Sequence, residues 1–309
     1  MLNGQRWVVQ TCLRLTRAGE PVRLVDRVPS RGTLVYHAKH EREVLSQLNG
    51  HRDLVLVSIR ADKRESRHAD LEVVQNGRWA DAGRRHHIPY WPQPGLMPRD
   101  PDRGSRVERV TFKGFDVNLH EYFFGREWRR WLLDNGFEWA HHSMGFEDSE
   151  RDGVAVEWHD YRDIDAVVAF RPKPEGRLGR RGFTSKPATK LYNAWHAGVP
   201  AILAPEYAYR ELRRSEIDYL EILAPEDARG ALLRLRHEPD LYRSMAENGR
   251  LRATEFTHDA IVQSWSELLN ITVPTLKRSR SFRALGKLPI TWRGRLRNLL
   301  RHLARRPGK

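Results

Sequence analysis

Short apolar runs that alternate with helical segments constrain the fold of this chain more than any other feature. The first series predicts strands at 21–28, 33–38, 53–59 and 71–76, with a helix at 41–48 between the second and the third. Aliphatic and β-branched runs of this length are typical of parallel strands, which are buried on both faces and connected by helices. The N-terminal third therefore predicts an α/β layer.

A second series of the same kind follows a stretch rich in Pro and Gly at 86–106, which is typical of a linker. Its predicted strands lie at 109–114, 154–159, 164–172 and 199–205, and its predicted helices at 126–137, 186–198, 226–238, 241–256 and 258–270. The predicted fold class is therefore α/β with two Rossmann-like domains. We expect a first domain at 1–95, a linker at 96–104, a second domain at 105–270 and a C-terminal tail at 271–309.

The first domain begins in an unusual way. Apolar residues at helical spacing predict a helix at 5–18, which Gly19 ends. A doubly wound domain usually opens with a strand and a glycine turn before its first helix, and here only Asn3-Gly4-Gln5 could remain of that turn. We expect that the first strand of this domain is missing, or that the natural chain begins further upstream.

Several classes of protein are excluded by composition. No apolar run approaches the roughly 20 residues of a membrane span, and the N-terminus does not resemble a secretory signal. The single cysteine, Cys12, rules out an internal disulfide and a cysteine-based zinc cluster. We therefore expect a cytoplasmic protein.

The basic character of the chain is concentrated in its tail. No acidic residue follows Glu267, whereas twelve of the lysines and arginines do, so that the tail accounts for most of the net charge of +14 and leaves +2 for residues 1–276. An apolar stripe also runs through the tail at helical spacing, formed by Trp292, Leu296, Leu299, Leu300 and Leu303.

A basic amphipathic helix of this kind suits the surface of an anionic membrane. We therefore expect a peripheral association with the inner face of the cell membrane. Nucleic acid is a rival partner, because arginine-rich segments bind phosphates generally. It is disfavoured here because the rest of the chain is almost neutral. A disordered basic tail is the third alternative.

Two lysines stand at the start of the helix predicted at 186–198. Lys186 and Lys190 are one turn apart, and Pro187 between them is favourable in a first helical turn, which Ser185 or Thr184 could cap. A helix N-terminus already carries partial positive charge, so added cations favour an anionic ligand there. Arg171 closes the preceding strand and is expected on the same side. Together they predict a diphosphate site, the alternative being a solvated basic surface.

The stretch KPATKLYNAWHAGVPAILAP, 186–205, resembles the nucleotide-sugar-binding helix and strand of GT-B glycosyltransferases. Ala194, Gly198, Pro200 and Ile202 match the family pattern. The segment from 226 to 269 is similar to the family's usual ending, and VTFKGFD at 110–116 resembles the first strand of its donor domain. The resemblance covers about residues 105–270 and is weak before residue 95.

The resemblance implies a set of donor-binding residues, with one departure from the family. Two glutamates usually contact the donor sugar and its ribose, and Ser185 and Asn193 stand at their positions, so that retention or inversion is left open. The expected donor-binding residues are Lys113, Gly114, Arg171, Ser185, Lys186, Thr189, Lys190 and Asn193.

An inverting transfer would also need a base in the first domain. Asp62 follows the strand predicted at 53–59, and His37 and His40 lie at the end of the strand at 33–38. We take Asp62 and His37 as the catalytic candidates, although each could equally be a surface or capping residue. No ligand spacing predicts a metal, and no cofactor is expected besides the donor.

These observations predict a metal-independent, hexosyltransferase-like glycosyltransferase of class EC 2.4. It would transfer a sugar from a nucleotide-diphosphate sugar to a glycan or lipid-linked acceptor in surface polysaccharide assembly. The alternative is a GT-B relative that binds nucleotide sugars or glycans without catalysis, which the two missing glutamates would permit.

Overall fold

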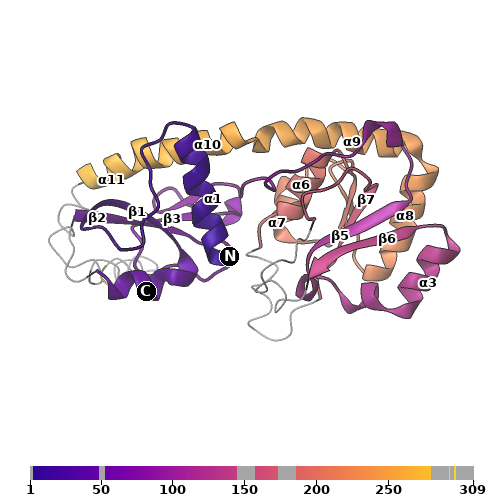
Figure 1. The fold of residues 1–309 in the computed structure, drawn as a ribbon, viewed down its shortest axis with the longest axis horizontal. Coiled ribbons are helices and arrows are strands. Elements are labelled where there is room, and N and C mark those ends of the chain that lie inside the picture. Colours follow the sequence, from indigo (N-terminus) through magenta and orange to yellow (C-terminus); the bar gives the residue numbers. More distant parts are fainter. Residues whose placement is uncertain are drawn as a thin grey trace, which may run out of the picture. The chain divides into compact units, whose positions relative to one another are not determined.

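The computed structural model describes residues 3–48, 53–144, 157–172 and 186–279, together with 292 and 296. The chain forms two compact units (Figure 1). Unit 1 comprises Met1–Tyr90 and His258–Lys309, and unit 2 comprises Trp91–Thr257. The chain leaves unit 1 within the Pro-rich stretch predicted as a linker. It returns at His258, so residues 258–270, expected in the second domain, belong to unit 1.

Unit 1 is built on a four-stranded sheet in the order β1-β2-β3-β4, in which every neighbouring pair is parallel. Its strands are Arg31–His37, Asp53–Ile59, Leu71–Val74 and Arg85–His87. β2 and β3 are almost wholly buried, as expected for central strands of a parallel sheet. Because all four strands run the same way, their carboxyl ends share one edge of the sheet. His37 at the end of β1 and the residues that follow Ile59 and Val74 lie at this edge.

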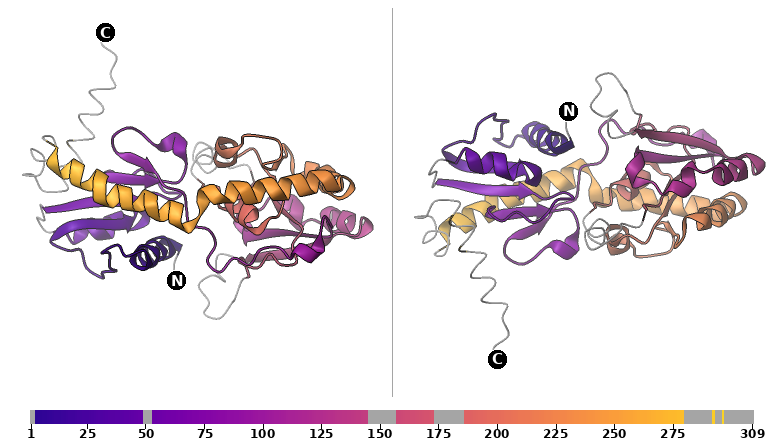
Figure 2. Two further views of the ribbon diagram at one scale, coloured as in Figure 1. Left: turned by 90° about the horizontal axis from the view of Figure 1, so that it is seen from above. Right: turned by 90° about the horizontal axis from the view of Figure 1, so that it is seen from below.

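Helices complete unit 1. α1 (Asn3–Arg17) packs against β1 and α10, and α2 (Glu41–Ser46) lies between β1 and β2 in the chain. α10 (His258–Glu267) leads through a π-helical turn at Leu268–Thr272 into α11 (Val273–Arg278). Two further views show α10 and α11 running along the sheet (Figure 2). Trp265 and Val273 anchor this return segment because both side chains are buried.

Unit 2 contains a five-stranded sheet in the order β6-β5-β7-β8-β9, again parallel throughout. The strands are Arg109–Phe115 (β5), Glu138–Met144 (β6), Ala166–Ala169 (β7), Ala201–Leu203 (β8) and Leu220–Glu221 (β9). The chain adds β6 on one side of β5 and then β7 on the other. The strand order therefore reverses between β5 and β7, which is where doubly wound sheets bind ligands.

Within the described residues of unit 2, the sheet is accompanied by the α-helices α3 (Arg126–Asp134), α6 (Thr189–Ala197), α7 (Tyr207–Leu212), α8 (Ala228–His237) and α9 (Pro239–Ala253). α6 packs on α9, and Trp195 of α6 is buried against Phe256. Gly198 ends α6 in the left-handed conformation, with φ of +67°. The chain therefore turns tightly from α6 into β8 through Gly198-Val199-Pro200.

One sequence prediction of a strand was wrong. Residues 21–28 form no strand, and Leu24 and Val25 are exposed, so their apolar pattern does not mark a buried element. The strand expected at 154–159 lies partly outside the described residues, and 157–159 contain no strand. Conversely, β4, β6, β9 and α7 were not predicted from the sequence.

The predicted tail helix cannot be compared with the structure in most of its length. Apart from Trp292 and Leu296, residues 280–309 lie outside the described part of the chain. Within that part, no helix combines the length and the apolar character needed to cross a membrane.

Candidate functional site

The start of α6 lies close to the reversal point of the unit 2 sheet. The helix begins at Thr189, and Ala188 precedes it without a side-chain hydrogen bond to the first turn. The sequence had suggested capping by Ser185 or Thr184 and a start near Pro187. Ser185 and Thr184 lie outside the described residues, and the helix begins two residues after Pro187. An N-terminus with unpaired N–H groups is a favourable place for an anion.

Lys190 lies in the first turn of α6 and reaches back to β5. Its Nζ stands 4.8 Å from the centre of the Phe112 ring. Gly114 permits this approach, since a Cβ at that position would come within 3.0 Å of the Lys190 Nζ and 3.2 Å of the Phe112 ring. Gly114 and Lys190, which are both among the expected donor-binding residues, are therefore brought together by the fold.

The surroundings of Lys190 disfavour the charged form of its side chain. Burial, followed by the positive charge of Arg171, lowers the pKa of Lys190 to about 7. Lys186, which is partly buried just before the helix, acts in the same direction, and Glu206 opposes it. A bound anion would supply the missing compensation.

Lys113 is engaged differently from Lys190. Its Nζ donates a hydrogen bond to the carbonyl of Glu157 at 2.9 Å and lies 4.8 Å from the Tyr161 ring. Burial lowers the pKa of Lys113 to about 8. This lysine lies next to Gly114 in β5, but its ammonium already has a partner.

Arg171, at the end of β7, is fixed by two acceptors. Its Nε donates to Oε1 of Glu206 at 2.8 Å, and its Nη1 donates to Oδ1 of Asn118 at 2.7 Å. Glu206 is 1% exposed and follows β8. Glu206 was not predicted from the sequence, in which its only sign is the position just after the strand predicted at 199–205.

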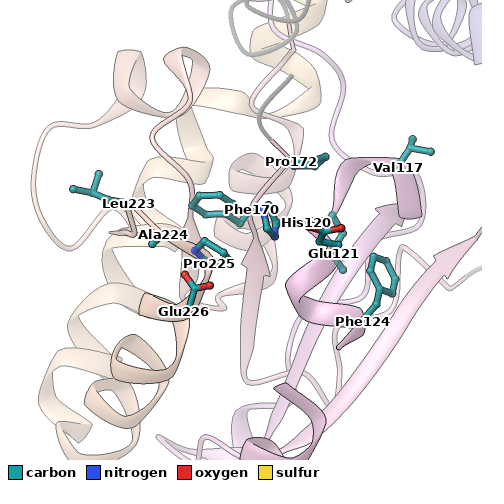
Figure 3. Close-up of a pocket in the computed structure, with 11 residues that line it drawn as sticks. Val117, His120, Glu121, Phe124, Phe170, Pro172, Leu223, Ala224, Pro225 and Glu226 are labelled. Carbon is teal, nitrogen blue, oxygen red and sulfur yellow. The ribbon is translucent and has the colours of Figure 1, made fainter. Parts of the chain in front are cut away.

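A pocket of about 600 Å³ adjoins this group (Figure 3). Phe170 and Pro172, the neighbours of Arg171 in the chain, line it together with segments 117–124 and 223–226. His120 stands beside Phe170, with the two rings 5.8 Å apart and nearly perpendicular. A cavity of this size accommodates one moiety of a larger ligand.

Asn193 is buried on α6, and its Oδ1 accepts a hydrogen bond from the backbone N–H of Gln93 at 3.0 Å. Thr189 and Lys186 are partly buried at the helix start. Of the predicted donor residues, the structure thus gathers Gly114, Lys190 and Arg171 at one place. It engages Lys113 and Asn193 in hydrogen bonds with the protein itself.

The two catalytic candidates lie in unit 1, at the carboxyl ends of β1 and β2. His37 is buried, and its Nδ1 accepts a hydrogen bond from the backbone N–H of Lys39 at 3.1 Å. Burial lowers the pKa of His37 to about 4, against the opposing effect of the Asp62 charge. The imidazole is therefore neutral at pH 7, and the hydrogen bond places its proton on Nε2.

Asp62 stands in the loop between β2 and β3, one residue after Ala61. Ala61 has φ of +50°, a conformation that no other described non-glycine residue adopts and that costs about 1–2 kcal/mol. The carboxylate of Asp62 is partly exposed and lies 3.5 Å from Nζ of Lys63. Strain of this kind is frequent at functional sites.

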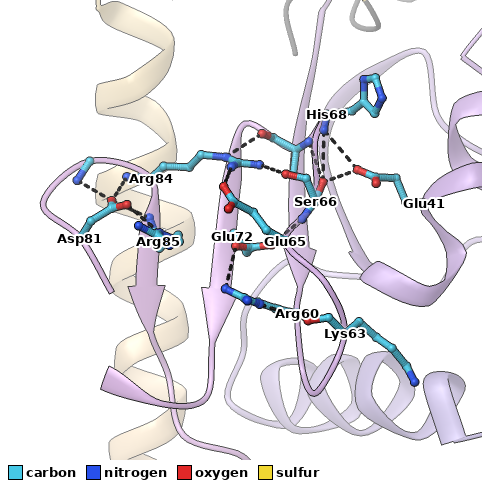
Figure 4. Close-up of polar contacts among 12 residues, drawn as sticks. Glu41, Arg60, Lys63, Glu65, Ser66, His68, Glu72, Asp81, Arg84 and Arg85 are labelled. Carbon is cyan, nitrogen blue, oxygen red and sulfur yellow. Dashed lines mark hydrogen bonds and ion pairs between the residues drawn. The ribbon is translucent and has the colours of Figure 1, made fainter. Parts of the chain in front are cut away.

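A polar network holds the Asp62 loop in place (Figure 4). Arg84 donates to the carbonyls of Ala69 and Ser66 and to the carboxylate of Glu65. The backbone N–H of Ser66 donates to Oε1 of the buried Glu72 at 2.8 Å. Because Arg84 directly precedes β4 and Glu72 lies in β3, the loop is tied to the sheet.

Comparison with solved structures identifies the fold. TarM matches with a TM-score of 0.55 and 10% identity, covering 79% of this chain and 56% of TarM. Sucrose-phosphate synthase from Thermosynechococcus elongatus matches at 0.53 and 13%, covering 88% and 78%. HepE from Anabaena in complex with UDP matches at 0.50 and 13%, covering 76% and 78%. This chain thus spans little more than half of TarM.

These neighbours are GT-B glycosyltransferases. Together with the two parallel sheets, the matches confirm that the chain has the GT-B fold of nucleotide-sugar glycosyltransferases. No family model matches the sequence, and no curated protein does.

Proposed function

We propose that the protein is a hexosyltransferase-like glycosyltransferase that moves a sugar from a nucleotide-diphosphate sugar to a glycan or lipid-linked acceptor. The observation that carries the proposal is the ammonium of Lys190, held at the start of α6 beside Arg171. The site lies where the strand order of a GT-B sheet reverses, so its position and its charge both suit a diphosphate.

In the proposed reaction, the bond between the sugar C1 and the diphosphate oxygen breaks as the acceptor oxygen attacks C1. Negative charge then grows on the diphosphate leaving group. Lys190 and the N–H groups of α6 would stabilise that charge without a metal, with Lys186 next to them. The adjoining pocket gives room for another moiety of the donor.

Asp62 is the stronger candidate for the base that takes the proton of the acceptor hydroxyl. Its carboxylate is partly exposed at the carboxyl end of β2. The Nδ1 of His37 already accepts a hydrogen bond from the backbone N–H of Lys39, which places the ring proton on Nε2. His37 is therefore a poor acceptor for a proton from the acceptor hydroxyl. This assignment applies to an inverting reaction.

The proposed setting is surface polysaccharide assembly at the cytoplasmic face of the cell membrane. HepE has been solved with UDP-glucose, and TarM with UDP and a glycerol-linked sugar, which supports a nucleotide-sugar donor and a glycan acceptor. The basic tail would hold the enzyme at an anionic membrane surface.

Titration with UDP and inorganic pyrophosphate tests the diphosphate site. Lys190→Ala should weaken both ligands by about tenfold or more, because a charge-assisted contact is lost, and Lys186→Ala should weaken them less. Lys277→Ala, at an exposed position on α11, is the control. Unchanged affinity in both site variants would refute the assignment. Hydrolysis of a bound UDP-sugar then distinguishes an enzyme from a protein that only binds.

A further inference from the structure

Glu206 presents an unused acceptor at the candidate site. Its Oε1 receives the Nε–H of Arg171, but its Oε2 has no hydrogen-bond partner among the described residues, although the side chain is 1% exposed. An unpaired buried carboxylate oxygen is costly. Such an atom beside a ligand site is a position where a ligand can supply the missing donor.

The surroundings limit what that donor can be. A carboxylate oxygen accepts hydrogen bonds and repels phosphate oxygens, so the diphosphate itself is not the partner. Glu206 lies near enough to Lys190 for its charge to act on the ammonium, and it holds Arg171 directly. A ligand whose diphosphate rests on Lys190 therefore brings its neighbouring groups to Glu206, and in a nucleotide sugar these groups carry hydroxyls.

We propose that Oε2 of Glu206 accepts a hydrogen bond from a hydroxyl of the bound nucleotide sugar, on the ribose or on the transferred sugar. The proposal rests on the proposed function and adds the residue that distinguishes a nucleotide sugar from a bare diphosphate. No carboxylate occurs at 185 or 193, where Ser185 and Asn193 stand. In this proposal the carboxylate of the site comes from the segment between β8 and α7 instead of from α6.

Glu206→Gln separates this role from a purely structural one. Glutamine keeps an oxygen that can accept from Nε of Arg171, and it removes a negative charge beside the diphosphate. We expect pyrophosphate to bind equally or more tightly, whereas UDP or UDP-glucose binds about 10- to 100-fold more weakly. A loss in UDP affinity places the contact on the ribose, and a loss confined to UDP-glucose places it on the sugar. Glu211→Gln, an exposed position on α7, is the matched control.

Equal weakening of pyrophosphate, UDP and UDP-glucose would overturn the proposal, because Glu206 would then act only by holding Arg171. Unchanged binding of all three ligands would overturn it as well. The wild-type protein provides an independent test that needs no variant. If it binds 2′-deoxy-UDP and 3′-deoxy-UDP as well as UDP, and UDP-glucose no better than UDP, no hydroxyl is recognised. Failure of every nucleotide and of pyrophosphate to bind would instead contradict the proposed function.

Discussion

At the scale of single residues, Lys190 is predicted to make the binding of a diphosphate depend on pH. Its pKa is lowered to about 7 in the free protein, and a bound diphosphate stabilises the charged form, so the pKa rises on binding. We therefore expect binding to take up a proton above pH 7 and the affinity to fall there, by up to about tenfold per pH unit. Isothermal titration of pyrophosphate between pH 6 and 9, in buffers of different ionisation enthalpy, measures both effects.

Lys190→Arg is the control for this pH dependence, because a guanidinium stays charged over the whole range. The variant should bind pyrophosphate with a much flatter pH profile, even if its affinity is lower. A wild-type profile that coincides with the profile of Lys190→Arg between pH 6 and 9 would contradict the titration of Lys190 at the bound anion.

Gly114 is predicted to matter through the space that it leaves for Lys190. In Gly114→Ala, the new methyl group would lie 3.0 Å from the Lys190 Nζ, and the flexible end of the lysine would move aside. We expect weaker pyrophosphate binding and also a lower thermal midpoint, because alanine is strained at the φ of +157° and its Cβ would lie 3.2 Å from the buried Phe112 ring. Gly230→Ala, where no atom lies within 4 Å of the added Cβ, should leave binding unchanged and stabilise α8 by about 1 kcal/mol or less.

At the scale of elements, apolar content decided which strands the sequence could predict. β2 and β7 are rich in aliphatic residues; β2 was predicted with its observed bounds, and β7 lies within the strand predicted at 164–172. β4 consists of Arg85-His86-His87, and β6 contains His141 and His142, so their composition does not resemble a strand. The strand predicted at 21–28 was wrong for the opposite reason, because apolar residues in this segment are exposed. Tertiary pairing, not local propensity, defines these elements.

Asp165 ties the starts of β5 and β7 to the segment that enters unit 2. Its wholly buried carboxylate accepts hydrogen bonds from the side chains of Arg99 and Arg103 and from the backbone N–H groups of Glu108 and Arg109. Asp165→Asn leaves the two arginines without their counter-charge and should cost about 3–5 kcal/mol of unfolding free energy. Urea denaturation measures this loss. Asp240→Asn, an exposed position at the start of α9, should cost less than about 1 kcal/mol.

The same carboxylate predicts a dependence of stability on acid. Burial tends to raise the pKa of Asp165, but its hydrogen bonds to Arg103 and the backbone outweigh this and lower it below 3.8. A depressed pKa contributes stability above the unfolded value, and this contribution is lost as the pH falls through the folded value. The difference in stability between wild type and Asp165→Asn should therefore shrink below pH 3.8.

At the scale of the whole molecule, the sequence predicted the fold and part of the candidate site. The two series of strands predicted two parallel sheets, and the lysines near 186–190 predicted a cationic helix start. The pairing of Arg171 with Glu206 could not be predicted, because the partners are 35 residues apart and meet only when β7 and β8 are paired. The return of α10 to unit 1 could not be predicted either, because its apolar pattern does not indicate which unit its buried face packs against.

The basic tail yields a prediction for the whole protein. Residues 280–309 hold ten lysines and arginines and no acidic residue, and each cation near an anionic bilayer contributes about 1 kcal/mol. Because Val273 is buried in unit 1, a deletion should begin at 280, so that α11 stays intact. The shortened protein should lose its binding to phosphatidylserine vesicles at 150 mM salt and keep its affinity for UDP. Neutral vesicles are the control for the wild type, and a shortened protein that still sediments with anionic vesicles would place the membrane contact in the units themselves.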